Sequence, residues 1–154
     1  MPEVEITDEQ KDAIKDLVAN NEHFLTIYKA VPFLVPIKAK ENDNNLDDTC
    51  DAFIDDQRML SNWPNHHANL DNVNWSVNAA VDRVNEAVAP VVEAMIGDDL
   101  KKQLPEDLPE SIKDKAVGAA CDKATEKGTE AVIKDLVNKQ LKGQPLGDEK
   151  YESE

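Results

Sequence analysis

The stretch that decides the fold is Val77 to Met95, "VNAAVDRVNEAVAPVVEAM". Its large apolar side chains recur at alternating steps of four and three residues: Val77, Val81, Val84, Val88, Val91 and Met95. Such an a/d pattern, sustained for almost three heptads, is typical of a helix that packs lengthwise against other helices. We therefore predict that this stretch is the central helix of a bundle.

The ends of this predicted helix are set by local signals. It is expected to begin near Asp71 or Asn72 and to stop at Gly97. Pro90 lies inside the pattern and cannot donate a backbone hydrogen bond to the Glu86 carbonyl, so we expect a kink there or a junction of two helices.

Downstream, the sequence predicts one long final helix over about residues 110–142, followed by the stop signals Gly143 and Pro145. Small residues recur every four positions within it, and such a row lets another helix approach closely. They are Ala116, Ala120, Ala124 and Gly128. Two i,i+4 pairs of opposite charge, Glu130 with Lys134 and Asp135 with Lys139, are expected to add a little helix stability.

Upstream, Thr7 and Gln10 form a capping-box pattern, and the apolar spacing that follows predicts a helix over about residues 8–31. Pro32 is expected to end it. Residues 31–37 hold five apolar residues and two prolines four positions apart. Because proline lacks the backbone donor of a regular helix, we predict an extended segment laid across the bundle here.

One more helix is predicted over about residues 45–62, from an apolar stripe that includes Leu46, Cys50 and Phe53. Composition agrees with an all-helical chain, because aromatic residues make up only 5% and there are only 5 glycines in 154 residues. The predicted fold class is all-α: a single-domain bundle of four or five helices with one Pro-interrupted extended segment. Residues 1–146 would form this domain, and residues 147–154 a flexible acidic tail.

The charge balance is strongly acidic, with 32 acidic against 17 basic residues and a formal net charge of −15. Direct nucleic-acid binding is not expected, because it needs a basic surface. The negative field instead favours a basic protein partner, and the alternative is that it only maintains solubility.

The N-terminus has no basic region followed by an apolar run, so no signal peptide is predicted. No apolar stretch is long enough for a membrane span, and we expect a cytoplasmic or otherwise soluble protein. Cys50 and Cys121 make one potential disulfide, and the sequence leaves their pairing open.

The most acidic stretch runs from Glu41 to Asp56, with seven acids and no base. It contains the DDxxD pattern Asp47-Asp48-Thr49-Cys50-Asp51, which in all-helical phosphate-processing enzymes holds Mg²⁺ against a diphosphate. A second acid-rich helical motif, which that chemistry also needs, does not stand out in the sequence. The simpler interpretation is a solvated helix face with acids at the helix N-terminus.

The stretch "NWPNHHANLDNVNW", Asn62 to Trp75, contains both tryptophans and two of the three histidines. His66 and His67 are adjacent, and adjacent side chains rarely bind one metal ion, so no metal site is predicted. Trp63 and Trp75 are either plugs at the end of the bundle or anchors for a partner.

The sequence contains no P-loop, GxGxxG, HExxH or GxSxG pattern, so no catalytic residue and no cofactor is predicted. The function we predict is that of a non-catalytic acidic binding protein, such as an inhibitor, immunity or antagonist protein that captures a basic protein. The alternatives are a self-associating structural subunit, which makes a homo-oligomer, and a Mg²⁺-dependent phosphate-processing enzyme. The predicted partner-binding residues are Asp43, Asp47, Asp48, Asp51, Asp55, Asp56, Trp63, His66, His67 and Trp75.

Overall fold

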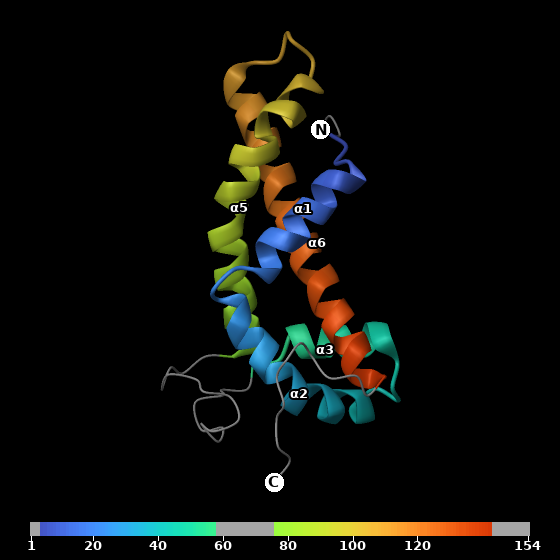
Figure 1. The fold of residues 1–154 in the computed structure, drawn as a ribbon. Helices are drawn as coiled ribbons and strands as arrows, with labels where there is room; N and C mark the ends of the chain where they lie inside the picture. Colours follow the sequence, from blue (N-terminus) through green and yellow to red (C-terminus); the bar gives the residue numbers. More distant parts are fainter. Residues whose placement is uncertain (1–3, 58–75, 143–154) are drawn as a thin grey trace.

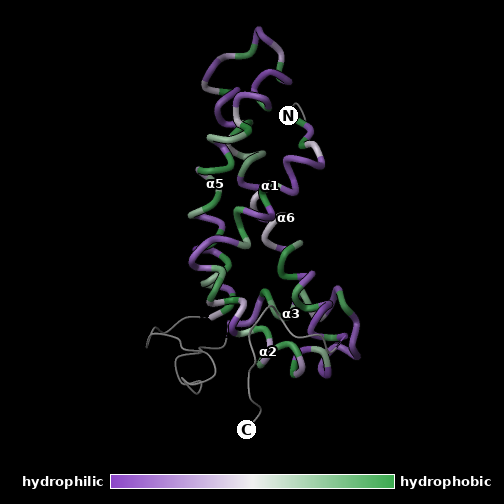
Figure 2. Tube along the Cα trace, viewed as in Figure 1, coloured by the Kyte–Doolittle hydropathy of each residue, from purple (hydrophilic) through white to green (hydrophobic). Residues whose placement is uncertain are grey.

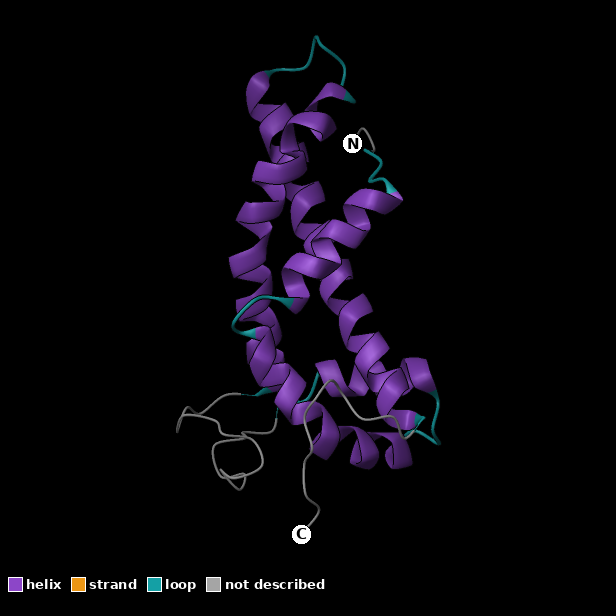
Figure 3. Ribbon diagram, viewed as in Figure 1, coloured by secondary structure: helices purple, strands orange, loops and turns teal. Residues whose placement is uncertain are grey.

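The computed structural model describes residues 4–57 and 76–142. Within these ranges the chain forms helices and no strand, which confirms the all-α fold class (Figures 1 and 3). The helices are α1 (Asp8–Ala19), α2 (Phe24–Glu41), α3 (Leu46–Ile54), α5 (Val77–Lys102) and α6 (Glu110–Leu141).

The long helices α5 and α6 run side by side and antiparallel, joined at one end by a short loop (Figure 1). α1 packs against both of them, whereas α2 and α3 lie at the opposite end from that loop. α5 and α6 each contact all four of the other described helices, so both lie at the centre of the packing. The sequence had predicted a central position for α5.

The buried side of α5 follows the predicted apolar pattern only in its first half. Val77, Val81, Val84 and Val88 are buried as predicted, but Val91 and Met95 are 48% and 42% exposed. The buried positions after Val88 are instead Val92, Ile96 and Leu100. A step of four residues overshoots one helical turn by about 40°, so repeated steps of four turn the buried side around the helix. Hydrophobic and hydrophilic residues alternate along α5, as expected for a helix with one buried side (Figure 2).

Two expectations about the limits of α5 are wrong: its start near Asp71 or Asn72 and its stop at Gly97. The helix begins at Val77 behind its N-cap Ser76, whose side chain accepts a hydrogen bond from the Ala79 amide. It continues through Pro90, which faces solvent, and through Gly97. A Cβ on Gly97 would lie 3.6 Å from Val117 in α6, an ordinary packing distance, so this glycine is a buried contact position and not a stop.

The single helix predicted over residues 8–31 is broken into α1 and α2, and the predicted extended segment over residues 31–37 is helical. Asn20 is the C-cap of α1, and its side-chain amide donates to the Asp16 carbonyl in addition to the regular backbone hydrogen bond. Both prolines lie inside α2, each removing one helical hydrogen bond. Burial offsets this loss, since eight of the 18 residues of α2 are buried: Phe24, Ile27, Ala30, Val31, Pro32, Leu34, Val35 and Ala39.

α3 is shorter than predicted, because Asp55 is its C-cap. Residues 58–62 of the predicted helix lie outside the described residues. At its start, the side chain of Asn45 accepts a hydrogen bond from the Asp48 amide at 2.9 Å and caps the helix.

α6 confirms the predicted final helix and its row of small residues. Ala116 and Gly128 are buried, and Ala120 and Ala124 pack against the core. At Gly128 the close neighbour is Ile14 of α1. The stop signals after α6 and the predicted tail at residues 147–154 lie outside the described part of the chain.

Candidate partner-binding site

The predicted acidic site is built on α3 and on the turn that precedes it. Asp43 and Asn44 have φ values of 53° and 61°, the left-handed conformation, and they reverse the chain between α2 and α3. Thr49, Cys50 and Phe53 are buried and hold one side of α3 against the core. The carboxylates on the other side are therefore held outward by a short, anchored helix.

Two of the predicted acidic residues are engaged within the chain. Asp47 Oδ1 lies 2.5 Å from Lys134 Nζ on α6. The hydrogen bond to Asp47 is the main cause that raises the pKa of Lys134 above its ordinary value. Lys134 therefore pairs with α3, and Asp135 pairs with Lys15 of α1 at 3.5 Å, instead of making the predicted contacts along α6.

The other engaged residue is Asp56, whose side chain is only 4% exposed. Its carboxylate lies 3.7 Å from Lys38 Nζ on α2, and its backbone carbonyl accepts a hydrogen bond from the Asn78 amide of α5. Asp56 thus links the end of α3 to two other helices and adds no carboxylate to the surface.

Besides the exposed but paired Asp47, four predicted acidic residues are exposed: Asp43, Asp48, Asp51 and Asp55. We call them the acidic surface. Asp48, Asp51 and Asp55 follow one another at steps of three and four, so they share one side of α3. No ion pair joins any of the four to another residue in the described ranges. Their negative charge is therefore directed at solvent.

A groove lies beside Asp43, between the end of α2 and the end of α6. Its volume is about 400 Å³. It is lined by Val35, Pro36, Ala39, Lys40, Asp43, Asn44, Gln140 and Leu141. Apolar walls next to a carboxylate are suited to the stem and the charged head of a basic side chain. We call it the α2–α6 groove.

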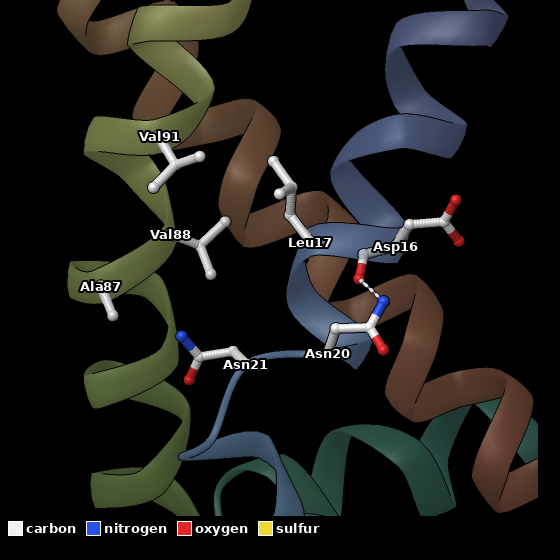
Figure 4. Close-up of a pocket in the computed structure, with 7 residues that line it drawn as sticks. All are labelled: Asp16, Leu17, Asn20, Asn21, Ala87, Val88 and Val91. Carbon is white, nitrogen blue, oxygen red and sulfur yellow. Dashed lines mark hydrogen bonds between the residues drawn. The ribbon is translucent and has the colours of Figure 1, made fainter.

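A second groove lies between the end of α1 and the middle of α5, with a volume of about 310 Å³ (Figure 4). Leu17 of α1 and Val88 of α5 point toward each other across it. The remaining lining residues are Asp16, Asn20, Asn21, Ala87 and Val91. The sequence pattern does not indicate this α1–α5 groove, because it places Val91 on the buried side of the helix, whereas Val91 is exposed.

The four other predicted binding residues, Trp63, His66, His67 and Trp75, lie outside the described residues. The structure therefore does not test their role as partner contacts.

The cysteines are both free and buried, so they do not form the disulfide that the sequence left open. Burial is the main cause that raises the pKa of each thiol to about 11. Both thiols are protonated at neutral pH and are poor nucleophiles.

Residues 4–57 and 76–142 contain no group of three or more His, Cys, Asp or Glu side chains arranged to hold a metal ion. The DDxxD carboxylates on α3 are thus not joined by a further ligand set in the described structure. None of the described helices combines the length and the apolar character required to cross a membrane.

Comparison with known proteins identifies no relative. No protein-family model, curated protein or solved structure matches this chain.

Proposed function

We propose that this chain is a non-catalytic acidic binding protein that captures a basic protein partner through the acidic surface. The observation that carries the proposal is that Asp43, Asp48, Asp51 and Asp55 are exposed and have no ion pair in the described structure. The nearby cations Lys38 and Lys134 are already paired with Asp56 and Asp47, and Lys40 is an exposed cation that lines the groove beside Asp43. Four carboxylates against this lysine leave the local charge negative, in a chain whose net charge is −15.

Such a surface speeds association with a cationic protein. Clustered charge of one sign steers an oppositely charged partner during diffusion and favours the right orientation of the encounter. The α2–α6 groove then offers apolar walls beside Asp43 for a lysine or arginine side chain of the partner. An inhibitor, immunity or antagonist protein that masks a cationic enzyme, such as a nuclease, works in this way.

The test is a titration of the full chain with purified cationic nucleases of pI above about 9. Calorimetry at 50 and 300 mM NaCl measures the dissociation constant. Because the contact is electrostatic, the expected result is at least one complex whose affinity falls about tenfold or more between the two salt concentrations.

The matched variants are two sets of four neutralised acids. D43N/D48N/D51N/D55N removes the acidic surface, whereas D12N/D82N/D122N/E126Q removes four exposed acids elsewhere. The first set is expected to weaken binding about tenfold and the second less than about threefold. Equal losses in both sets would mean attraction to the net charge alone, and absence of binding to every nuclease at 50 mM NaCl would also overturn the proposal.

The two other predicted functions have less support. A magnesium-dependent enzyme needs a second set of ligands, which the described residues do not supply. Self-association through the Val77–Met95 stripe or the small-residue row of α6 is blocked where these surfaces are covered by the chain itself. The exposed side of α5 remains available for self-association.

A further inference from the structure

α5 carries an exposed apolar face that no described helix covers. It consists of Ala87, Pro90, Val91, Ala94 and Met95, all of them exposed, and we call it the α5 face. These residues follow one another at helical spacing and lie on one side of α5. The α1–α5 groove opens along its edge, since Ala87 and Val91 line that groove (Figure 4). Contiguous apolar surface of this kind marks a contact site.

The charges at the two ends of the α5 face make it complementary to itself. Arg83 lies one turn before Ala87, and Asp98 lies one turn after Ala94. Both are exposed, and neither makes an ion pair within the described ranges. They are equally far from the midpoint between Pro90 and Val91. A twofold axis at that midpoint therefore brings each Arg83 opposite the second copy's Asp98.

The same antiparallel arrangement matches the side chains between these charges. It places Ala87 opposite the second copy's Ala94, and such small residues let two helices approach closely. Met95 of one copy lies opposite Glu86 and Ala87 of the second copy, beside the second copy's α1–α5 groove. A flexible methionine side chain suits a groove with the apolar residues Leu17 and Val88 in its walls.

We propose that two copies of this chain form a twofold dimer in which their α5 faces pack antiparallel, with Arg83 of each copy paired to Asp98 of the other. A twofold contact is the commonest way in which identical chains associate. From Arg83 to Asp98 the contact runs about 22 Å along the helix. An interface built on one helix from each copy lies at the small end of specific contacts, so the dissociation constant is expected on the order of 10–100 µM.

The first experiment is sedimentation equilibrium of the full chain from about 5 to 500 µM, a range chosen to bracket that constant. V91E/M95E places charge in the middle of the interface, and it is expected to weaken dimerisation at least about tenfold. The matched control L25E/I112E adds the same charge at two equally exposed apolar residues of α2 and α6. It is expected to dimerise like the wild type. Circular dichroism checks that both variants remain helical.

The second experiment tests the antiparallel register by charge reversal. R83D places two acids opposite each other and weakens the dimer, as D98R does by placing two bases opposite each other. The double variant R83D/D98R restores opposite charges and is expected to recover the wild-type dissociation constant within about threefold. Arg83 and Asp98 are exposed and their side chains make no hydrogen bond or ion pair in the described ranges, so these changes are expected to leave the fold intact.

Three results would overturn the proposal: a wild-type chain that stays monomeric at 500 µM, equal effects of V91E/M95E and L25E/I112E, or no recovery in R83D/D98R. Salt separates this proposal from the capture of a basic partner. Two copies of charge −15 repel each other, and salt screens that repulsion, so dimerisation is maintained or strengthened at 300 mM NaCl while capture weakens.

Discussion

A Cβ atom on Gly128 of α6 would lie 2.7 Å from Cγ2 of Ile14 in α1, closer than real Cβ atoms come to other atoms. Ile14 is only 1% exposed, so its side chain is enclosed and has little room to move away. The Ile14 side chain of α1 therefore packs directly against the backbone of α6 at Gly128. This contact explains why the small-residue row of α6 ends in a glycine.

Gly128→Ala is expected to destabilise the fold. Alanine is the better helix former, but the added methyl group must displace Ile14 or push α1 away from α6. Overpacking of this kind costs about 1–3 kcal/mol of the free energy of unfolding. Urea denaturation followed by circular dichroism measures the change.

Gly118→Ala is the control in the same helix, because a Cβ there meets no atom within 4 Å. Only the helix propensity changes, so the free energy of unfolding is expected to rise by up to about 1 kcal/mol. If both variants shift stability in the same direction, α1 does not press on Gly128 as described.

The buried pair of Lys38 and Asp56 gives the second prediction. Lys38→Met leaves the Asp56 carboxylate, which is 4% exposed, without its nearest described cation. Removing one partner of a fully buried pair costs about 3–5 kcal/mol, but Lys38 is 17% exposed and Asp56 keeps a further interaction, so the expected cost here is smaller, about 1–2 kcal/mol. The midpoint of urea denaturation is expected to fall accordingly.

Glu41→Gln is the control that separates the effect of burying a carboxylate from the effect of its charge on stability. Glu41 lies at the same 3.7 Å from Lys38, but its side chain is 58% exposed. Solvent screens that pair, so its loss is expected to cost less than about 1 kcal/mol. Comparable losses in the two variants would contradict a special role for the buried carboxylate.

The raised pKa values of the thiols predict that stability falls in alkaline solution. An unfolded thiol ionises near 9.0, whereas Cys50 and Cys121 in the folded chain have pKa values of about 11. Between these values the unfolded chain binds fewer protons than the folded one, so rising pH favours unfolding. The stability that both thiols contribute is fully present below pH 9 and is lost as the pH approaches 11.

The measurement is the difference in free energy of unfolding between the wild type and C50A/C121A from pH 8 to pH 11. The lysine contributions cancel in this difference, because both chains keep the same lysines. The wild type is expected to lose more stability than the variant over this range. A constant difference between the two would show that the thiols titrate alike in the folded and unfolded chains.

Local signals predicted the helices better than they predicted which sides the helices bury. The capping box of Thr7 and Gln10 is present as predicted, since a cap depends on residues three positions apart. The exposure of Val91 depends on how α1 and α6 lie around α5, and a spacing pattern does not contain that information. The helical Pro32 and Pro36 are a similar case, because burial of their neighbours outweighed a local preference against helix.

The same contrast between local signals and packing holds for the candidate site. The sequence identified an acidic stretch, and four of its predicted residues are exposed and make no ion pair in the described ranges. It did not show that Lys134, far along the chain, binds Asp47, or that Lys38 lies beside the buried Asp56. Such pairings across helices follow from the packing of α2, α3 and α6, so only the structure separates the free carboxylates from the engaged ones.

The last prediction separates stability from partner binding at Asp43. Its φ of 53° is unfavourable for residues with a Cβ, and the cost for alanine is greater than for aspartate. Asp43→Ala is expected to lower the free energy of unfolding by about 1 kcal/mol, whereas Asp43→Gly removes the backbone strain and raises it by up to about 1 kcal/mol. Both variants lose the same carboxylate, so both should weaken binding to the cationic nuclease by the same factor. Urea denaturation and calorimetric titration of the two variants check this, and an affinity that follows stability instead of charge would contradict a direct contact at Asp43.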